Sequence, residues 1–237
     1  MARANYVQYE TAEQIPDEVS LIWVNSPANP TGEVKSVAEL QAIVNRAREI
    51  GAVVVSDECY IELGWEIQPV SILHPTIIGA SNESVLAVHS LSKRSNLAGY
   101  RSGAVMGDPK LVSDILALRK HAGMLLAAPI AAATIAALAD ADHVKAQRDV
   151  YHNRRSSLRQ AITGAGFQVD FSHAGLYLWA TLGRSGMETV DLLAEVGILC
   201  APGDFYGPAG VNHVRMALTA TDDRIEQVAS RLADLKL

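Results

Sequence analysis

The stretch SLSKRSNLAGYRSG, residues 90–103, decides the fold class, because it connects two apolar runs. Lys93 stands among serines, three residues after the run VLAVHS at 85–90, and Arg101 opens the next run, RSGAVMG at 101–107. Polar residues that directly follow a buried strand are typical of the ligand-binding edge of an open α/β sheet. Lys93 is therefore a candidate functional residue.

The first half of the chain alternates short apolar runs with helical patterns. Besides 85–90 and 101–107, we expect strands at VSLIWVN, 19–25, and AVVVSDE, 52–58. Between these two, residues 36–51 predict a helix that Ser36 caps, with Glu39 in the capping-box position and Gly51 as the stop. Continuous valine and alanine runs between helices predict a mostly parallel sheet that is covered on both faces.

Helical patterns follow this sheet. Asp108-Pro109 is expected to open a long helical region. Within it, LLAAPIAAATIAALA at 125–139 is shorter than the roughly 20 residues that a membrane span requires. We therefore expect this run to form a buried helix and no contact with a membrane.

The pattern changes from residue 140 onward. A charged amphipathic helix is expected first, and then short strands at FQVDF, GLYLWATL, GILCA (197–201) and HVRMAL (213–218), with helices over 188–196 and 222–235. The sequence thus predicts a large α/β domain over 1–139 and a small α+β domain over 140–237.

Composition excludes several functional classes. The formal net charge is −6 and no basic cluster occurs, which argues against nucleic-acid binding. The N-terminal residues have no apolar core of a secretory signal. The two cysteines, Cys59 and Cys200, lie far apart and suggest neither a disulfide framework nor a metal site, which fits a cytoplasmic protein.

Polar clusters follow three of the expected strands. NSPANPTG follows the first strand, SDECY ends the second, and HSLSK ends the third. Since the carboxyl ends of parallel strands meet at one edge, these clusters predict a single ligand site.

The motifs in these clusters also occur in one known family, in the same order. They are N-P-T-G at 29–32, D-E-x-Y at 57–60, S-x-S-K at 90–93, G-x-R-x-G at 99–103, and the arginine of HVRMAL. The sequence resembles the C-terminal part of a class I/II aminotransferase, a fold-type I enzyme that uses pyridoxal 5′-phosphate (PLP). The resemblance implies a truncated large PLP-binding domain followed by the small domain, with no metal.

The resemblance also implies residue roles in catalysis. Lys93 would be the Schiff-base lysine, whose amine also carries the proton between the substrate α-carbon and the cofactor. Asp57 would keep the pyridine nitrogen protonated, and Tyr60 would hydrogen-bond the cofactor O3′.

Further residues would bind the cofactor and the substrate. Ser90 and Arg101 match phosphate ligands, with Ser92 assisting, because the guanidinium fork suits phosphate oxygens. Asn29 would contact O3′ and help to hold the substrate carboxylate, and Arg215 would bind that carboxylate. A charged residue in an apolar strand needs a partner, so a structural salt bridge is the alternative role of Arg215.

The resemblance covers no N-terminal half, which in the family carries a phosphate-binding loop and the aromatic residue that stacks on the pyridine. We expect a truncated product or, alternatively, a separate chain that supplies this half. In either case we expect weak PLP binding and exposed apolar edges that favour a homodimer or a partner chain.

The implied reaction is amino transfer between an amino acid and a 2-oxo acid. SDECYIELGW, HSLSKRSNLAGYRSG and CAPGDFYGPAG are similar to N-succinyldiaminopimelate aminotransferases of lysine biosynthesis, with N-succinyl-LL-2,6-diaminopimelate and 2-oxoglutarate as substrates. An aspartate-type or other amino-acid aminotransferase is the alternative, and a truncated, non-catalytic scaffold is another.

Overall fold

The computed structural model describes residues 5–235, which form two compact units. The first unit comprises residues up to 26, 35–61 and 69–138, and the second comprises 27–34, 62–68 and the chain from 139 onward. Each unit has its own four-stranded sheet.

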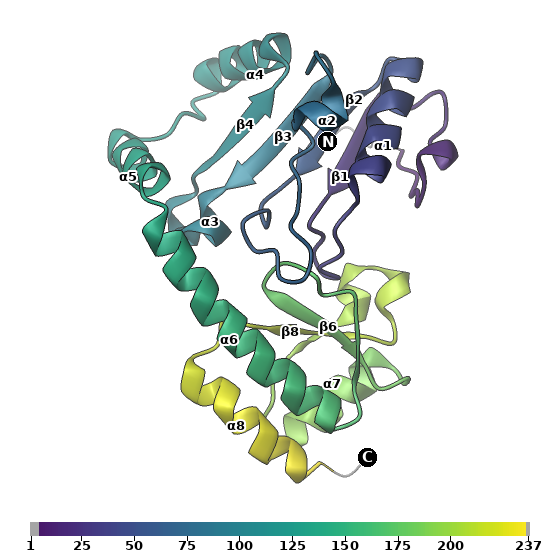
Figure 1. Ribbon diagram of the computed structural model, residues 1–237, viewed down its shortest axis with the longest axis vertical. Helices are drawn as coiled ribbons and strands as arrows, with labels where there is room; N and C mark the ends of the chain where they lie inside the picture. The colour runs from purple at the N-terminus through teal and green to yellow at the C-terminus, as the bar shows by residue number, and fades with distance from the viewer. Residues whose placement is uncertain (1–4, 236–237) are drawn as a thin grey trace. The chain divides into compact units, whose positions relative to one another are not determined.

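The sheet of the first unit carries the strands that the sequence predicted. Its order is β1 (Leu21–Asn25), β2 (Val53–Asp57), β3 (Val85–Ser90) and β4 (Gly103–Gly107). The first three strands run parallel, and β4 pairs antiparallel with β3 (Figure 1). The sheet is therefore mostly parallel, as expected.

Helix α1 begins and ends at the predicted signals, and α4 begins at a predicted one. In α1 (Val37–Ile50) the Ser36 hydroxyl accepts from the Glu39 amide at 3.2 Å, and Gly51 ends the helix with φ +72°. The Asp108 carboxylate caps α4 (Pro109–His121). The remaining helices are η1 (Ala12–Gln14), α2 (Pro75–Ile78), α3 (Leu91–Arg94), η2 (Ala98–Tyr100) and α5 (Ala128–Ala139).

The core of the first unit lies between α1 and one face of the sheet. It includes Ile22, Val24, Leu40, Val44 and Val54. The expectation that both faces are covered is wrong, because β1 alternates, and Leu21 and Trp23 each keep 55% of their surface exposed.

The apolar run at 125–139 is a second departure. It does form a helix, α5, but no residue of α5 is buried, and Ile135 is 70% exposed. The expectation of a buried helix is therefore wrong, because apolar composition sets what a helix can bury and only a packed neighbour buries it.

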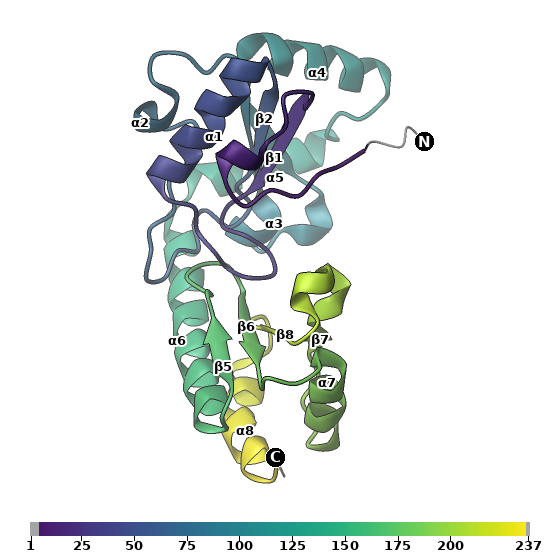
Figure 2. The ribbon, with the colours of Figure 1, turned by 90° about the vertical axis from the view of Figure 1, so that its right-hand side faces the viewer.

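The second unit is α+β. Its antiparallel sheet has the order β5 (Gln168–Asp170), β6 (Tyr177–Thr181), β8 (Val214–Ala217) and β7 (Ala201–Pro202). Figure 2 shows α6 (Asp142–Gly164) and α8 (Asp222–Ala233) side by side on one side of this sheet. The other elements are α7 (Gly186–Glu195), η3 (Gly203–Tyr206) and η4 (Pro208–Gly210).

The expected strand at 197–201 is largely absent. Gly197 has φ +74°, its carbonyl accepts from the Arg231 guanidinium, and Leu199 is 91% exposed. Of this run only Ala201 pairs with β8, together with the following Pro202. Among the described residues, no helix is long and apolar enough to cross a membrane.

Candidate active site

Asp57 and Lys93 lie at the same edge of the sheet in the first unit. Asp57 is the last residue of β2, and Lys93 lies in α3, which directly follows β3, the parallel neighbour of β2. Asn25 ends β1 in register with Asp57, and its side-chain amide donates to the Asp57 carbonyl at 3.4 Å. The strand-end clusters of β2 and β3 thus meet, as the parallel arrangement requires.

Cys59 shows how close these groups are. Its backbone N–H donates to Asp57 Oδ1 at 3.1 Å, which orients the carboxylate. Burial raises the pKa of the Cys59 thiol to about 12, the Asp57 carboxylate adds to the increase, and Lys93 and Ser90 oppose it. One thiol therefore interacts with Asp57, Lys93 and Ser90. With this pKa it stays protonated at neutral pH and is no nucleophile.

The Lys93 amine has no fixed counter-charge. Its Nζ lies 6.0 Å from the centroid of the Tyr60 ring, which is 6% exposed. Among the described residues, Lys93 forms no hydrogen bond and no salt bridge, although its side chain is half-buried. An amine held in this way is available for chemistry, because no hydrogen bond or salt bridge of the described residues would have to break.

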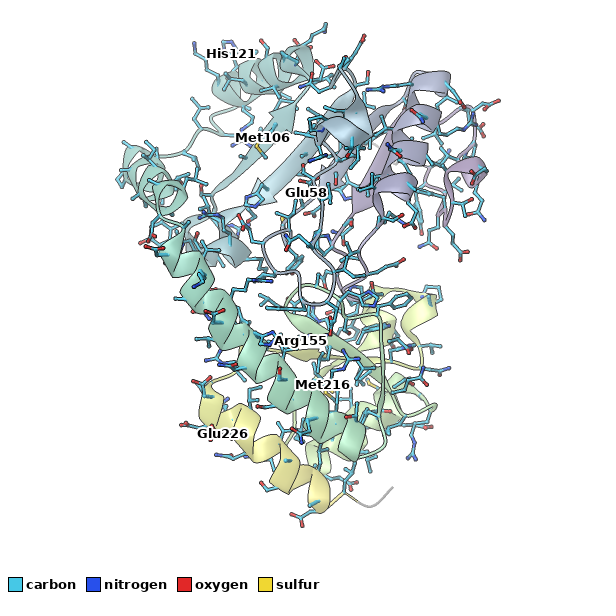
Figure 3. The ribbon with its side chains drawn as sticks, viewed as in Figure 1. Glu58, Met106, His121, Arg155, Met216 and Glu226 are labelled. Atoms are coloured by element: carbon cyan, nitrogen blue, oxygen red, sulfur yellow. The ribbon has the colours of Figure 1, made fainter. Side chains whose placement is uncertain are left out.

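Glu58, labelled in Figure 3, follows Asp57 but plays a structural role. It is 3% exposed, and its carboxylate accepts from the Ile72 backbone N–H at 2.7 Å. Burial raises the pKa of the Glu58 carboxyl, while hydrogen bonds from Ile72, Ser71 and Ser56 oppose the increase. The two neighbouring carboxyl groups thus differ in their surroundings: Glu58 is buried in the core, and Asp57 lies at the edge of the sheet.

Ser90 and Ser92 hold the first turn of α3. Ser90 is the N-cap, and its hydroxyl accepts from the Ser92 backbone N–H at 3.1 Å. This contact fixes the polar turn that carries Lys93. Both serines are half-buried at the site where the sequence predicted phosphate ligands.

Arg101 lies on the strained connection between η2 and β4. Its φ of +54° is left-handed, and its exposed guanidinium donates to the Ala98 carbonyl at 2.9 Å. Gly103 follows because a Cβ there would lie 2.5 Å from the His89 carbonyl, so only glycine lets β4 pair with β3. Arg101 and His89 line a cavity of about 610 Å³ with residues of β4 and α4.

Arg215 and Asn29 meet in the second unit. Arg215 is in β8, and its Nη1 donates to Asn29 Oδ1 at 3.0 Å. The loop that carries Asn29 is anchored at Gly32, where φ is +69° and a Cβ would lie 2.5 Å from the Ala174 carbonyl. Asn29 and Arg215, which are 186 residues apart in sequence, are therefore brought together.

The structure gives Arg215 no structural salt bridge. Within residues 5–235, no carboxylate lies within ion-pair distance of its guanidinium, and its buried Nε has no hydrogen-bond partner. Instead, its guanidinium carbon lies 3.8 Å from the Tyr177 ring centroid and 4.8 Å from that of Tyr206. A guanidinium with an unsatisfied buried N–H suits a carboxylate ligand.

Sequence reasoning missed both tyrosines. The alternation in GLYLWATL places Tyr177 and Trp179 on one face of β6, and Trp179 lies opposite Arg215 in register. That signal could have identified Tyr177. Tyr206 is the last residue of the short helix η3, which has no periodic pattern, so no sequence signal places it beside Arg215.

The donor set of the first unit fits PLP. No group of three or more metal-ligating side chains occurs in the part of the chain that the structure describes. The first unit offers an unpaired lysine amine, an oriented carboxylate and two serine hydroxyls. These are the functional groups that an aldehyde, a pyridine nitrogen and a phosphate would require.

Comparisons with known proteins agree with this donor set. The sequence profile of the family described as "Aminotransferase class I and II" matches residues 4–232. A Mycobacterium tuberculosis protein named as a "probable aminotransferase" is 54% identical over 217 residues, which are 92% of this chain and 52% of that protein. The 4-dedimethylamino-4-oxo-anhydrotetracycline transaminase OxyQ of Streptomyces rimosus is 56% identical over 216 residues, 91% of this chain and 60% of that protein.

A solved aminotransferase structure also matches this chain. The N-succinyldiaminopimelate aminotransferase of Mycobacterium tuberculosis superposes with a TM-score of 0.82 at 26% identity, over 94% of this chain and 60% of that one. The chain thus spans between half and two thirds of the length of these relatives.

Proposed function

Because the chain belongs to the class I and II aminotransferases, a PLP-dependent family, we propose that it serves amino transfer between an amino acid and a 2-oxo acid. The family and the structural match support the fold class expected from the sequence, the fold type I of PLP-dependent transferases. The observation that carries the functional proposal is the half-buried, unpaired Lys93 amine beside the carboxylate of Asp57.

Bound PLP supplies the electron sink and the amino-group carrier that transamination requires. Lys93 Nζ removes and returns the proton at the substrate α-carbon, because it has no competing partner. Asp57, oriented by the Cys59 N–H, keeps one carboxylate oxygen available to hold a proton on the ring nitrogen. Tyr60, whose ring lies near Lys93, supplies a phenol at the same edge.

The other residues bind the cofactor and the substrate. Ser90, Ser92 and Arg101 are the proposed phosphate ligands. Arg215 binds the substrate carboxylate through its guanidinium, and Asn29, which accepts from Arg215 Nη1, fixes the direction of that group.

The proposed substrate pair is N-succinyl-LL-2,6-diaminopimelate and 2-oxoglutarate. Its support is the structural match to an N-succinyldiaminopimelate aminotransferase. The 56% identity to OxyQ favours a second candidate, a ring ketone as amino acceptor. Amino transfer from glutamate to the 2-oxo acid that corresponds to N-succinyl-LL-2,6-diaminopimelate and, separately, to the ring ketone, measured side by side, distinguishes the two candidates.

The proposed role of Lys93 is tested by reductive trapping. The chain is mixed with PLP, treated with borohydride and digested, and the modified peptides are identified by mass spectrometry. We expect the pyridoxyl group on Lys93 in preference to exposed lysines such as Lys110, because Lys110 is ion-paired with Asp114 at 2.8 Å. Equal labelling of all lysines would contradict the proposal.

The Lys93→Ala variant completes this test. We expect it to lose both the trapped product and amino transfer from glutamate. Lys110→Ala is the matched control and is expected to retain both. Amino transfer that survives in Lys93→Ala would exclude the assigned role.

A non-catalytic scaffold is a second candidate function. One observation favours it: no residue of α4 or α5 is buried, so the first unit offers a wide surface for a partner. A scaffold predicts no trapping at Lys93 and no amino transfer, even with excess PLP.

A further inference from the structure

The Arg215 guanidinium is surrounded in a way that the carboxylate role does not by itself require. Tyr177 and Tyr206 both present ring faces to it, at 3.8 and 4.8 Å from the ring centroids. We name these two residues the aromatic clamp. Contacts of a guanidinium with aromatic faces are attractive, and they exclude water from the faces of the cation.

The position of Tyr206 is set by a buried stack. Its ring meets Trp179 edge-on at 6.1 Å between centroids, and Trp179 is 4% exposed. Trp179 in turn stacks on the His213 ring, with 4.9 Å between the ring centroids and an angle of 4° between the ring planes. His213 Nε2 lies 2.8 Å from Asp170 Oδ2, which anchors the far end of the stack.

Glycines bring the loop that carries Tyr206 against this stack. A Cβ at Gly203 would lie 2.7 Å from the indole of Trp179 and 2.2 Å from the Gly210 carbonyl. A Cβ at Gly210 would likewise lie 2.2 Å from the Gly203 carbonyl, so neither glycine tolerates a side chain without a shift of the backbone. Tyr206, three residues after Gly203, is held over Arg215 by this close packing and not by a flexible tether.

With the aromatic clamp in place, one hydrogen-bond donor of Arg215 still has no partner. Asn29 occupies Nη1, the rings contact the guanidinium group, and the buried Nε has no partner. A long arginine side chain normally loses rotamer freedom when it binds a ligand, and a group that is already fixed avoids this cost. The hydrogen-bonding edge of Arg215 is thus pre-oriented for an acceptor.

We propose that Tyr206 and Tyr177 are positioning residues that pre-orient Arg215 and thereby set the affinity for carboxylate substrates. This inference rests on the proposed function, in which Arg215 binds a carboxylate. It adds that the aromatic ring, and not the phenol hydroxyl, is what the site requires.

The test is an NMR titration with 2-oxoglutarate, observed on the Arg215 Nε–Hε signal, which is assigned by its loss in Arg215→Lys. We expect Tyr206→Phe to bind like the wild type and Tyr206→Leu to bind about tenfold more weakly. Phe205→Leu is the matched control, because Phe205 is the neighbouring ring in sequence, is 73% exposed and is not one of the two rings that contact the Arg215 guanidinium. Tyr206 is itself 37% exposed, so its variants are expected to fold.

Each other outcome overturns the inference. These outcomes are an unchanged affinity in Tyr206→Leu, an equal loss in Tyr206→Phe or in Phe205→Leu, and no binding by the wild type. Where amino transfer is measured, Tyr206→Leu should raise KM for the 2-oxo acid with kcat within about twofold. The titration needs no PLP, so failure of the Lys93 trapping experiment remains a separate result.

Discussion

Two adjacent carboxyl groups, Asp57 and Glu58, show how surroundings separate chemistry from structure. Asp57 is half-buried at the strand end, and its carboxylate accepts a hydrogen bond from the Cys59 N–H. Glu58 is 3% exposed, and its carboxylate accepts a hydrogen bond from the Ile72 N–H. The alternation of side chains along a strand places successive residues on opposite faces. The first carboxylate is therefore available to a ligand, and the second stabilises a loop.

The burial of Glu58 has a consequence for stability. Because its folded pKa lies above its ordinary value of 4.5, the folded state binds this proton more tightly than the unfolded chain does. The resulting stabilisation is complete below pH 4.5 and is lost as pH rises through the folded pKa. Ionised Glu58 therefore lowers the free energy of unfolding at neutral pH.

We expect Glu58→Gln to remove this pH dependence. The amide oxygen of glutamine can still accept the Ile72 N–H, but it carries no charge. Urea unfolding at several pH values should show a free energy that no longer falls across this window and that exceeds the wild-type value at pH 7. The exposed Glu226→Gln is the control and should keep the wild-type profile. A steeper fall in Glu58→Gln would show the assignment to be wrong.

Residue-level predictions from the sequence depended on local signals. Asp57 and Lys93 could be placed at one edge, because Asp57 ends one strand and Lys93 lies three residues after the next, and the pattern predicted that these strands pair parallel. The contact between Asn29 and Arg215 and the rings around Arg215 could not be predicted from periodicity, since they depend on a loop and on the register of β6 with β8. The roles proposed for these residues remain predictions.

At the scale of elements, α1 shows how much a capping signal determines. Ser36, Glu39 and Gly51 were predicted as its start, capping box and stop, and the structure has all three. The Ser36 N–H also donates to Glu39 Oε2 at 2.7 Å, so two backbone donors are satisfied reciprocally.

We expect Ser36→Ala to destabilise α1 by about 1 kcal/mol. Ser185→Ala is the matched control, because Ser185 is the N-cap of α7 but makes no side-chain capping bond. Hydrogen–deuterium exchange in the first turn of each helix is the measurement. Exchange should accelerate in α1 of the first variant and stay nearly constant in α7 of the second. Equal effects in both helices would show that the capping bond of Ser36 contributes nothing.

Two predicted elements differ for reasons that lie outside local sequence. The run at 197–201 is apolar enough for a strand, yet Gly197 adopts a left-handed φ and Pro202 has no N–H to donate. The run at 125–139 was predicted to be buried from its composition, but α5 has no neighbour that covers it. Pairing and burial are both properties of the partner segment, which a single sequence window does not contain.

At the scale of the whole molecule, the first unit exposes an unusual amount of apolar surface. Leu21 and Trp23 on β1, Leu116 and Leu118 on α4, and Ile135 and Leu138 on α5 are each more than half exposed. Extended apolar patches of this kind mark interaction sites or aggregation liabilities in soluble proteins. In addition, β1 is an edge strand of its sheet, and sheet edges favour strand addition.

We therefore expect the isolated chain to self-associate through its first unit. Sedimentation velocity should show a species that grows with concentration, and Ile135→Glu should shift it towards the monomer, because a charge buried in an apolar interface is costly. Leu199→Glu is the matched control, since Leu199 is 91% exposed but lies in the second unit. A wild-type chain that stays monomeric at every concentration, or an equal effect of the two substitutions, would place the interaction elsewhere. Association that Ile135→Glu alone reduces would assign it to α5.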